Sequence, residues 1–168
     1  MRVRSLIVGV MFFVALAPAA GQRPKYGVKA KADKQADLTR LTTYAWMSGW
    51  TSFVHDVDLQ IVTAVDRELA NRGFVKLESE PSDMLVTYAA MQRTDVDLKS
   101  KRTGDPKLHR SYPVGTLIVL LLEPDTHREL FRARGDAPLA TGPAAIAAQI
   151  DSLVAQMFER CPSRTAPR

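Results

Sequence analysis

An apolar run at residues 114–122 constrains the fold more than any other segment of the chain. Pro113 precedes the run and turn-forming residues at 123–126 end it, so its length is fixed by two breaks. A short apolar run between turn signals is typical of a buried β-strand, because helices are usually longer. Successive side chains of a strand point to opposite faces, and residues 117–122 are apolar at every position. The strand is therefore predicted to need cover on both faces, from a loop or from another molecule.

Two amphipathic helices are predicted, one in each half of the chain. The first spans residues 56–72, where apolar side chains recur every three or four residues. Asp56 or Asp58 is expected to cap its N-terminus. The second helix opens with Pro143, where a missing N–H costs nothing, and it ends before Pro162. Each helix needs one apolar surface on which to pack.

The remaining strands complete an α+β domain. Alternating or β-branched residues predict strands at 28–32, 41–46, 74–77, 84–98 and 129–134, in addition to 114–122. The order is strand, strand, helix, four strands, helix. This order predicts a two-layer sandwich, in which both helices pack on one face of a mostly antiparallel sheet of about six strands. The polar residues between 93 and 113 are expected to form a long hairpin tip.

The N-terminus has the layout of a secretory signal peptide. Arg2 and Arg4 precede an apolar run at residues 6–17, which is shorter than the roughly 20 residues of a membrane span. Small residues follow, so cleavage is expected after Ala19 to Gly21. The processed protein is expected to be exported and soluble, in the periplasm or outside the cell. It is expected to have no transmembrane anchor and, since no cysteine adjoins the cleavage point, no lipid anchor.

These features divide the chain into four parts. They are a signal peptide at 1–19, a flexible leader at 20–27, a single α+β domain at 28–162 and a frayed basic tail at 163–168.

Patterns typical of catalysis are missing from the sequence. There is no His-Glu-x-x-His, no Gly-x-Ser-x-Gly and no phosphate-binding glycine loop. His55 with Asp56 and Asp58 has the chemistry of a weak metal site, but a helix start explains the same residues. Cys161 is the single cysteine, and its helical spacing predicts a buried packing role. We expect no enzyme activity, no cofactor, no bound metal and no nucleic-acid partner.

Two groups of residues are candidates for binding. Aromatic residues around the second strand either line a ligand groove or cover one end of the core: Tyr44, Trp46, Trp50 and Phe53. Leu120, on the two-sided apolar strand, is the candidate for contact through the sheet face. The second group is the basic part of the hairpin, expected either to contact an anionic surface or to be a solvated tip: Arg93, Lys99, Lys101, Arg102, Lys107 and Arg110.

Five blocks of the sequence resemble a bacterial envelope family catalogued as domain of unknown function 4136. The blocks are residues 42–46, 68–74, 81–88, 115–119 and the closing helix to Phe158, within a resemblance that covers 28–162. Many members of that family are lipoproteins, and the resemblance brings no catalytic residues. This chain departs from its relatives in lacking the lipid-accepting cysteine. It also has Leu120 where an acidic residue is common, and residues 131–133 replace a tryptophan followed by Arg-Gly.

The sequence therefore predicts an exported cell-envelope protein that acts as a non-enzymatic binding or interaction module. Its partner is expected to be an envelope protein, an apolar ligand or a second copy held through the sheet face. The alternative is an electrostatic adaptor that contacts anionic membrane or cell wall through the basic hairpin at 93–110. An unrecognised hydrolase is the weakest alternative.

Overall fold

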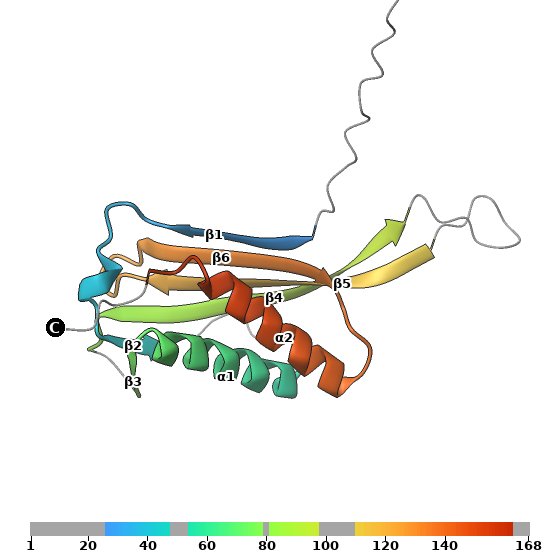
Figure 1. Cartoon of the computed structure of the whole chain (residues 1–168), viewed down its shortest axis with the longest axis horizontal. Coiled ribbons are helices and arrows are strands. Elements are labelled where there is room, and N and C mark those ends of the chain that lie inside the picture. Colours follow the sequence, from blue (N-terminus) through green and yellow to red (C-terminus); the bar gives the residue numbers. More distant parts are fainter. Residues whose placement is uncertain (1–25, 48–53, 79–80, 98–109, 163–168) are drawn as a thin grey trace, which may run out of the picture.

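Six strands form one sheet, and two helices cover one of its faces (Figure 1). The computed structural model describes residues 26–47, 54–78, 81–97 and 110–162. In chain order the elements are β1 (Gly27–Ala32), the 3-10 turn η1 (Leu38–Arg40), β2 (Thr43–Trp46), α1 (His55–Asn71), β3 (Val75–Leu77), β4 (Met84–Asp97), β5 (Arg110–Leu122), β6 (Glu129–Pro138) and α2 (Pro143–Phe158). The predicted α+β class and element order are confirmed.

The sheet has the strand order β1-β6-β5-β4-β2-β3. Neighbouring strands in the segment β1-β6-β5-β4 are antiparallel. In contrast, β2 runs parallel to both of its neighbours, β3 and β4. The β2–β3 pair is parallel because α1 carries the chain back over the sheet between these two strands. The sheet is therefore mixed, with an antiparallel majority.

β5 and β6 are longer than the sequence predicts. β4 and β5 remain paired as far as Asp97 opposite Arg110, so both ends of the predicted hairpin tip, 93–97 and 110–113, are regular strand. β6 likewise continues to Pro138. Backbone pairing proceeds through polar segments because their side chains point away from the sheet into solvent.

The start of α1 differs from the predicted cap. Val54 is the N-cap residue and its side chain makes no capping hydrogen bond, while Asp56 and Asp58 lie within the first turn. The Asp58 carboxylate instead accepts a hydrogen bond of 2.7 Å from the Tyr88 hydroxyl of β4. The N-cap position therefore differs from the predicted one, whereas the two acids do lie in the first turn, where negative charge favours the helix dipole.

The core lies between the helices and the sheet. Buried side chains from α1, α2 and the facing sides of the strands form one cluster, which includes Cys161. Gly135 of β6 lets α2 approach closely, since an added Cβ there would lie 2.6 Å from Cδ1 of Leu153. Among the described residues, neither helix is long and apolar enough to cross a membrane.

The opposite face of the sheet, called the open face below, carries a smaller apolar cluster. Ala45, Leu85 and Leu122 are buried there, and Met47 and Leu120 pack against them. Neither α1 nor α2 covers this face (Figure 1). The two-sided apolar character of β5 therefore corresponds to two separate clusters, one under the helices and one on the open face.

Several sequence predictions lie outside the described residues. These are the signal peptide, most of the leader, the C-terminal tail, and Trp50, Phe53, Lys99, Lys101, Arg102 and Lys107.

Candidate binding site

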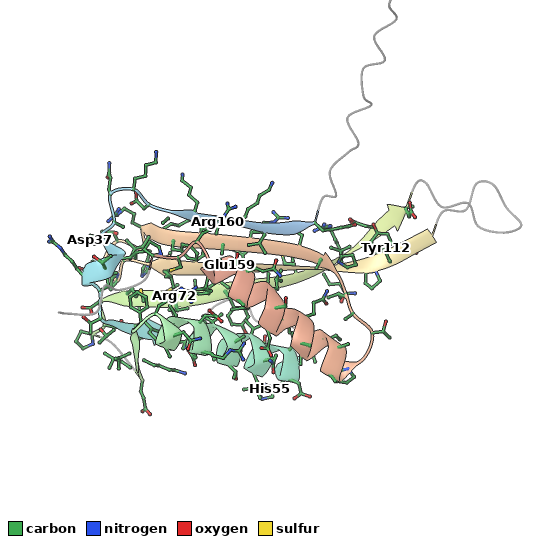
Figure 2. All side chains as sticks on the ribbon, in the orientation of Figure 1. Asp37, His55, Arg72, Tyr112, Glu159 and Arg160 are labelled. Carbon is green, nitrogen blue, oxygen red and sulfur yellow. The ribbon has the colours of Figure 1, made fainter. Side chains whose placement is uncertain are left out.

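An apolar groove lies between the N-terminal halves of the two helices. It has a volume of about 240 Å³, and its floor is formed by β4 and β5. The apolar walls include Ile61, Ala90, Leu117, Ile146, Ile150 and Leu153. Figure 2 shows His55, the first residue of α1, at the same end of the helix layer as the start of α2.

The helices are joined to each other away from the groove. At their C-terminal ends, Arg72 donates a hydrogen bond of 2.5 Å to the Phe158 carbonyl and lies over the Phe158 ring. Near the middle, Gln60 and Arg67 both donate to the Asp151 carboxylate, at 2.8 and 3.1 Å. The groove occupies the part of the helix pair beyond these contacts.

An exposed apolar side chain lies at the rim of the groove. Val54 is 55% exposed and belongs to the groove lining. A concave apolar surface with an exposed apolar side chain at its rim is typical of a ligand site.

The polar side chains at the groove are amides. Gln92 and Gln149 belong to the lining, whereas the Thr116 hydroxyl lies on the opposite face of the sheet, where it donates to Asp136 at 2.6 Å. Gln149 donates to the Pro138 carbonyl at 2.7 Å and accepts from the Ala140 N–H at 3.0 Å. These two bonds attach residues 138–140 to α2, so Gln149 builds one wall of the groove.

Tyr44 and Trp46 lie in the core and not in the groove lining. The Tyr44 hydroxyl and the Trp46 indole N–H both donate to Asp66 of α1 at 2.8 Å. Trp46 also packs edge-on against Tyr88, with ring centroids 5.9 Å apart. Burial and the Asp66 carboxylate raise the pKa of Tyr44 above its usual value. Of the two alternatives for the aromatic group, the structure places these two members in the cover of the core.

The open face carries a second notable arrangement, which the sequence analysis missed. The strand register creates two cross-strand rows over β1, β6 and β5, each with two cations followed by a branched apolar side chain. These are the two basic rows: Lys29–Arg134–Ile118 and Lys31–Arg132–Leu120. The alternating lysines of residues 27–32 and the alternating arginines of β6 were visible in the sequence. Their alignment depends on β1 pairing with β6, which local sequence does not reveal.

Arg93 is held in a polar network on the open face. It donates to Asp136 at 2.8 Å, to Thr116 at 2.9 Å and to Asp95 at 3.0 Å. Hydrogen bonds from Arg134, Thr116 and Arg93 hold the pKa of Asp136 well below its usual range. The structure therefore places Arg93, a candidate for anionic contact, between two carboxylates of its own chain.

The same network extends to the outer part of β4 and β5. The Tyr26 hydroxyl donates to Asp95 at 2.8 Å and lies 2.6 Å from the Tyr112 hydroxyl. Figure 2 shows Tyr112 on the portion of β5 that extends beyond the helices. Arg110, another candidate for anionic contact, is the first residue of β5, and its backbone lies opposite Asp97 in the β4–β5 register.

The remaining candidates for chemistry are a thiol and the histidine of α1. Cys161 is 5% exposed, and burial raises the pKa of its thiol to about 12. His55 begins α1 as part of its first turn. Within the described segments, no group of three His, Cys, Asp or Glu side chains is arranged to hold a metal ion.

The chain belongs to the family described as a domain of unknown function, DUF4136, whose model matches residues 28–163. A search of curated protein sequences finds no match. A solved DUF4136 family protein from Bacteroides thetaiotaomicron is 15% identical and has a TM-score of 0.56; the match covers 82% of this chain and 96% of that protein. A dodecameric PelC variant from Paraburkholderia phytofirmans is 14% identical and has a TM-score of 0.54, over 83% of this chain and 98% of that protein. At this identity the likeness shows a shared fold.

The comparisons correct the prediction of a protein without a lipid anchor. Proteins named as lipoproteins are among the similar solved structures. One is a minor lipoprotein from Acinetobacter baumannii, 13% identical with a TM-score of 0.41, over 71% of this chain and 91% of that protein. That expectation rested only on the absence of a cysteine near the expected cleavage point.

Proposed function

We propose that this member of the DUF4136 family is a non-enzymatic binding module of the cell envelope, which holds an apolar ligand in the groove between α1 and α2. The observation that carries the proposal is the groove itself, an apolar cavity of about 240 Å³ with the exposed Val54 at its rim. Apolar surface of this kind gains free energy when a ligand removes it from water.

The size of the groove favours a small hydrocarbon group. Dry apolar cavities of about 150 Å³ are known to bind benzene in other proteins. A volume of about 240 Å³ therefore accommodates a short acyl chain or one aromatic group of a larger ligand. The open side of the groove leaves room for the rest of such a ligand.

The side chains around the groove support binding more than catalysis. The amides of Gln92 and Gln149 supply hydrogen-bonding groups that orient a ligand. Amides do not exchange protons near neutral pH, so they are poor general acids or bases. Gln149 is also committed to the backbone at Pro138 and Ala140.

The sequence supports a location in the cell envelope. Residues 1–19 have the layout of an export signal, and the DUF4136 model covers the domain that follows. Lipoproteins among the similar structures agree with this location.

A neutral apolar dye tests the proposal directly. N-phenyl-1-naphthylamine should bind the protein with an increase in fluorescence, and short-chain alcohols or fatty acids should displace it. Ala90→Phe places a ring in the groove and should weaken dye binding at least about tenfold, which corresponds to about 1.4 kcal/mol. Ala148→Phe adds the same ring at an exposed position of α2 outside the groove lining, so it should leave binding unchanged. Equal binding by both variants would contradict the proposed site.

A further inference from the structure

We propose that the open face of the sheet docks on an anionic lipid surface through the two basic rows. The rows place four cations on β1 and β6, next to Ile118 and Leu120 on β5. Positive charge selects an anionic partner, and the adjoining apolar side chains suit the boundary between lipid headgroups and acyl chains. Long basic side chains reach the headgroups while their methylene stems lie along apolar surface.

Protection of the sheet edge explains only part of this arrangement. β1 is an edge strand, and lysines on an edge strand hinder pairing with another chain. Arg132 and Arg134 lie on the second strand, which is paired on both sides. Each of these arginines lies directly opposite a lysine, an arrangement of like charges that destabilises a sheet. The presence of all four cations on this face therefore points to a role outside folding.

Carboxylates reduce the positive charge of the rows without cancelling it. Arg132 pairs with Glu129 at 2.8 Å and Arg134 pairs with Asp136 at 2.9 Å. Asp136 is shared with Arg93, so one carboxylate serves two guanidinium groups. Lys29 and Lys31 are exposed on the edge strand, where they add two further positive charges.

The position of the rows leaves the groove free. The side chains of Lys29, Arg132 and Leu120 belong to the face opposite the helices, whereas the groove lies between the helices. A lipid surface in contact with the rows therefore does not cover the groove. Docking and ligand binding can be tested separately for this reason.

Cosedimentation of the full chain with lipid vesicles tests the docking proposal. The protein should bind vesicles of phosphatidylglycerol and phosphatidylcholine more tightly than vesicles of phosphatidylcholine alone, and added salt should weaken the binding. Lys29→Gln with Lys31→Gln should weaken binding about 25-fold, since each basic residue near an anionic membrane contributes about fivefold. The matched control, Lys34→Gln with Arg160→Gln, removes two exposed charges outside the rows and should change binding about twofold or less.

Leu120→Ser distinguishes a lipid surface from a soluble polyanion. It should weaken vesicle binding, because it removes the apolar part of one row and keeps all four cations. Ala90→Phe, which fills the groove, should leave vesicle binding unchanged even if dye binding is lost. Thermal unfolding of each variant verifies that it is folded.

Three outcomes would overturn the docking proposal. The first is equal binding to charged and uncharged vesicles, or no binding to either. The second is full vesicle binding by the folded double-lysine variant. The third is complete competition by soluble polyphosphate together with no effect of Leu120→Ser, which would identify a soluble anionic polymer as the partner.

Discussion

Lys29 of β1 lies directly opposite Arg134 of β6, so two cationic residues form a cross-strand pair on the open face. Arg134 is also held by Asp136, through bonds of 2.9 Å from both Nε and Nη2. This carboxylate fixes the arginine in place beside Lys29. Like charges in directly opposed positions oppose pairing of the two strands.

Reversing the charge of Lys29 should therefore stabilise the protein. Lys29→Glu replaces a like-charge pair with an opposite-charge pair, which should raise the free energy of unfolding by about 0.5 kcal/mol. Urea denaturation measures the change. Lys34→Glu, in the exposed turn after β1, is the matched control and should have a smaller effect. A less stable Lys29→Glu variant would show that the pair is not repulsive in the folded protein.

Asp136 should be the most important acidic residue of the open face for stability. Its side chain is 12% exposed and accepts from Arg93, Arg134 and Thr116. Asp136→Asn leaves two guanidinium groups without their shared carboxylate and should lower the free energy of unfolding by about 2 kcal/mol. Glu129→Gln removes the exposed partner of Arg132 and should cost about 0.5 kcal/mol or less. Equal losses in chemical denaturation would contradict the difference in burial.

The same carboxylate should make stability fall in acid. Arg134, Thr116 and Arg93 lower the pKa of Asp136 in the folded protein below its ordinary value of 3.8. A group whose pKa is lowered by folding stabilises the protein above its unfolded pKa, and this contribution is lost as the pH falls further. The free energy of unfolding should therefore decrease below about pH 4, and it should decrease less in Asp136→Asn. Parallel pH profiles for the two proteins would contradict this assignment.

Gly135 should be required for the packing of α2 on the sheet. An added Cβ would lie 2.6 Å from Cδ1 of Leu153 and 2.9 Å from Cε of Met157, both in the buried interface. Gly135→Ala should lower the free energy of unfolding by about 1–3 kcal/mol, which is typical of overpacking. At Gly115 the close contact is with Leu139 alone, a half-buried side chain outside the core cluster. Gly115→Ala should therefore cost less, and thermal melts of the two variants compare them directly.

Local sequence was sufficient to predict most elements of the fold. The helical spacing at Ile61, Val65 and Leu69 predicts α1, and these residues are buried. The apolar run before Glu123 predicts β5 with apolar side chains on both faces, and both faces carry apolar clusters. Periodicity and turn residues are local properties, so they can be read without knowledge of strand pairing.

The candidate surfaces required information that local sequence does not contain. The groove depends on how the starts of α1 and α2 lie over Ala90 and Leu117, which are far apart in sequence from both helix starts. The basic rows depend on β1 returning to pair with β6, so that Lys29 reaches Arg134. The hydrogen bond between Asp58 and Tyr88 joins two elements that are 30 residues apart, so local sequence does not predict it.

Native mass spectrometry of the protein purified from its own host tests the proposed binding function most directly. The account predicts that the wild-type protein and Ala148→Phe carry an apolar molecule of defined mass. Ala90→Phe, which fills the groove, should be recovered folded and without that molecule. An identical bound molecule in all three proteins, or none in the wild type, would contradict binding in the groove.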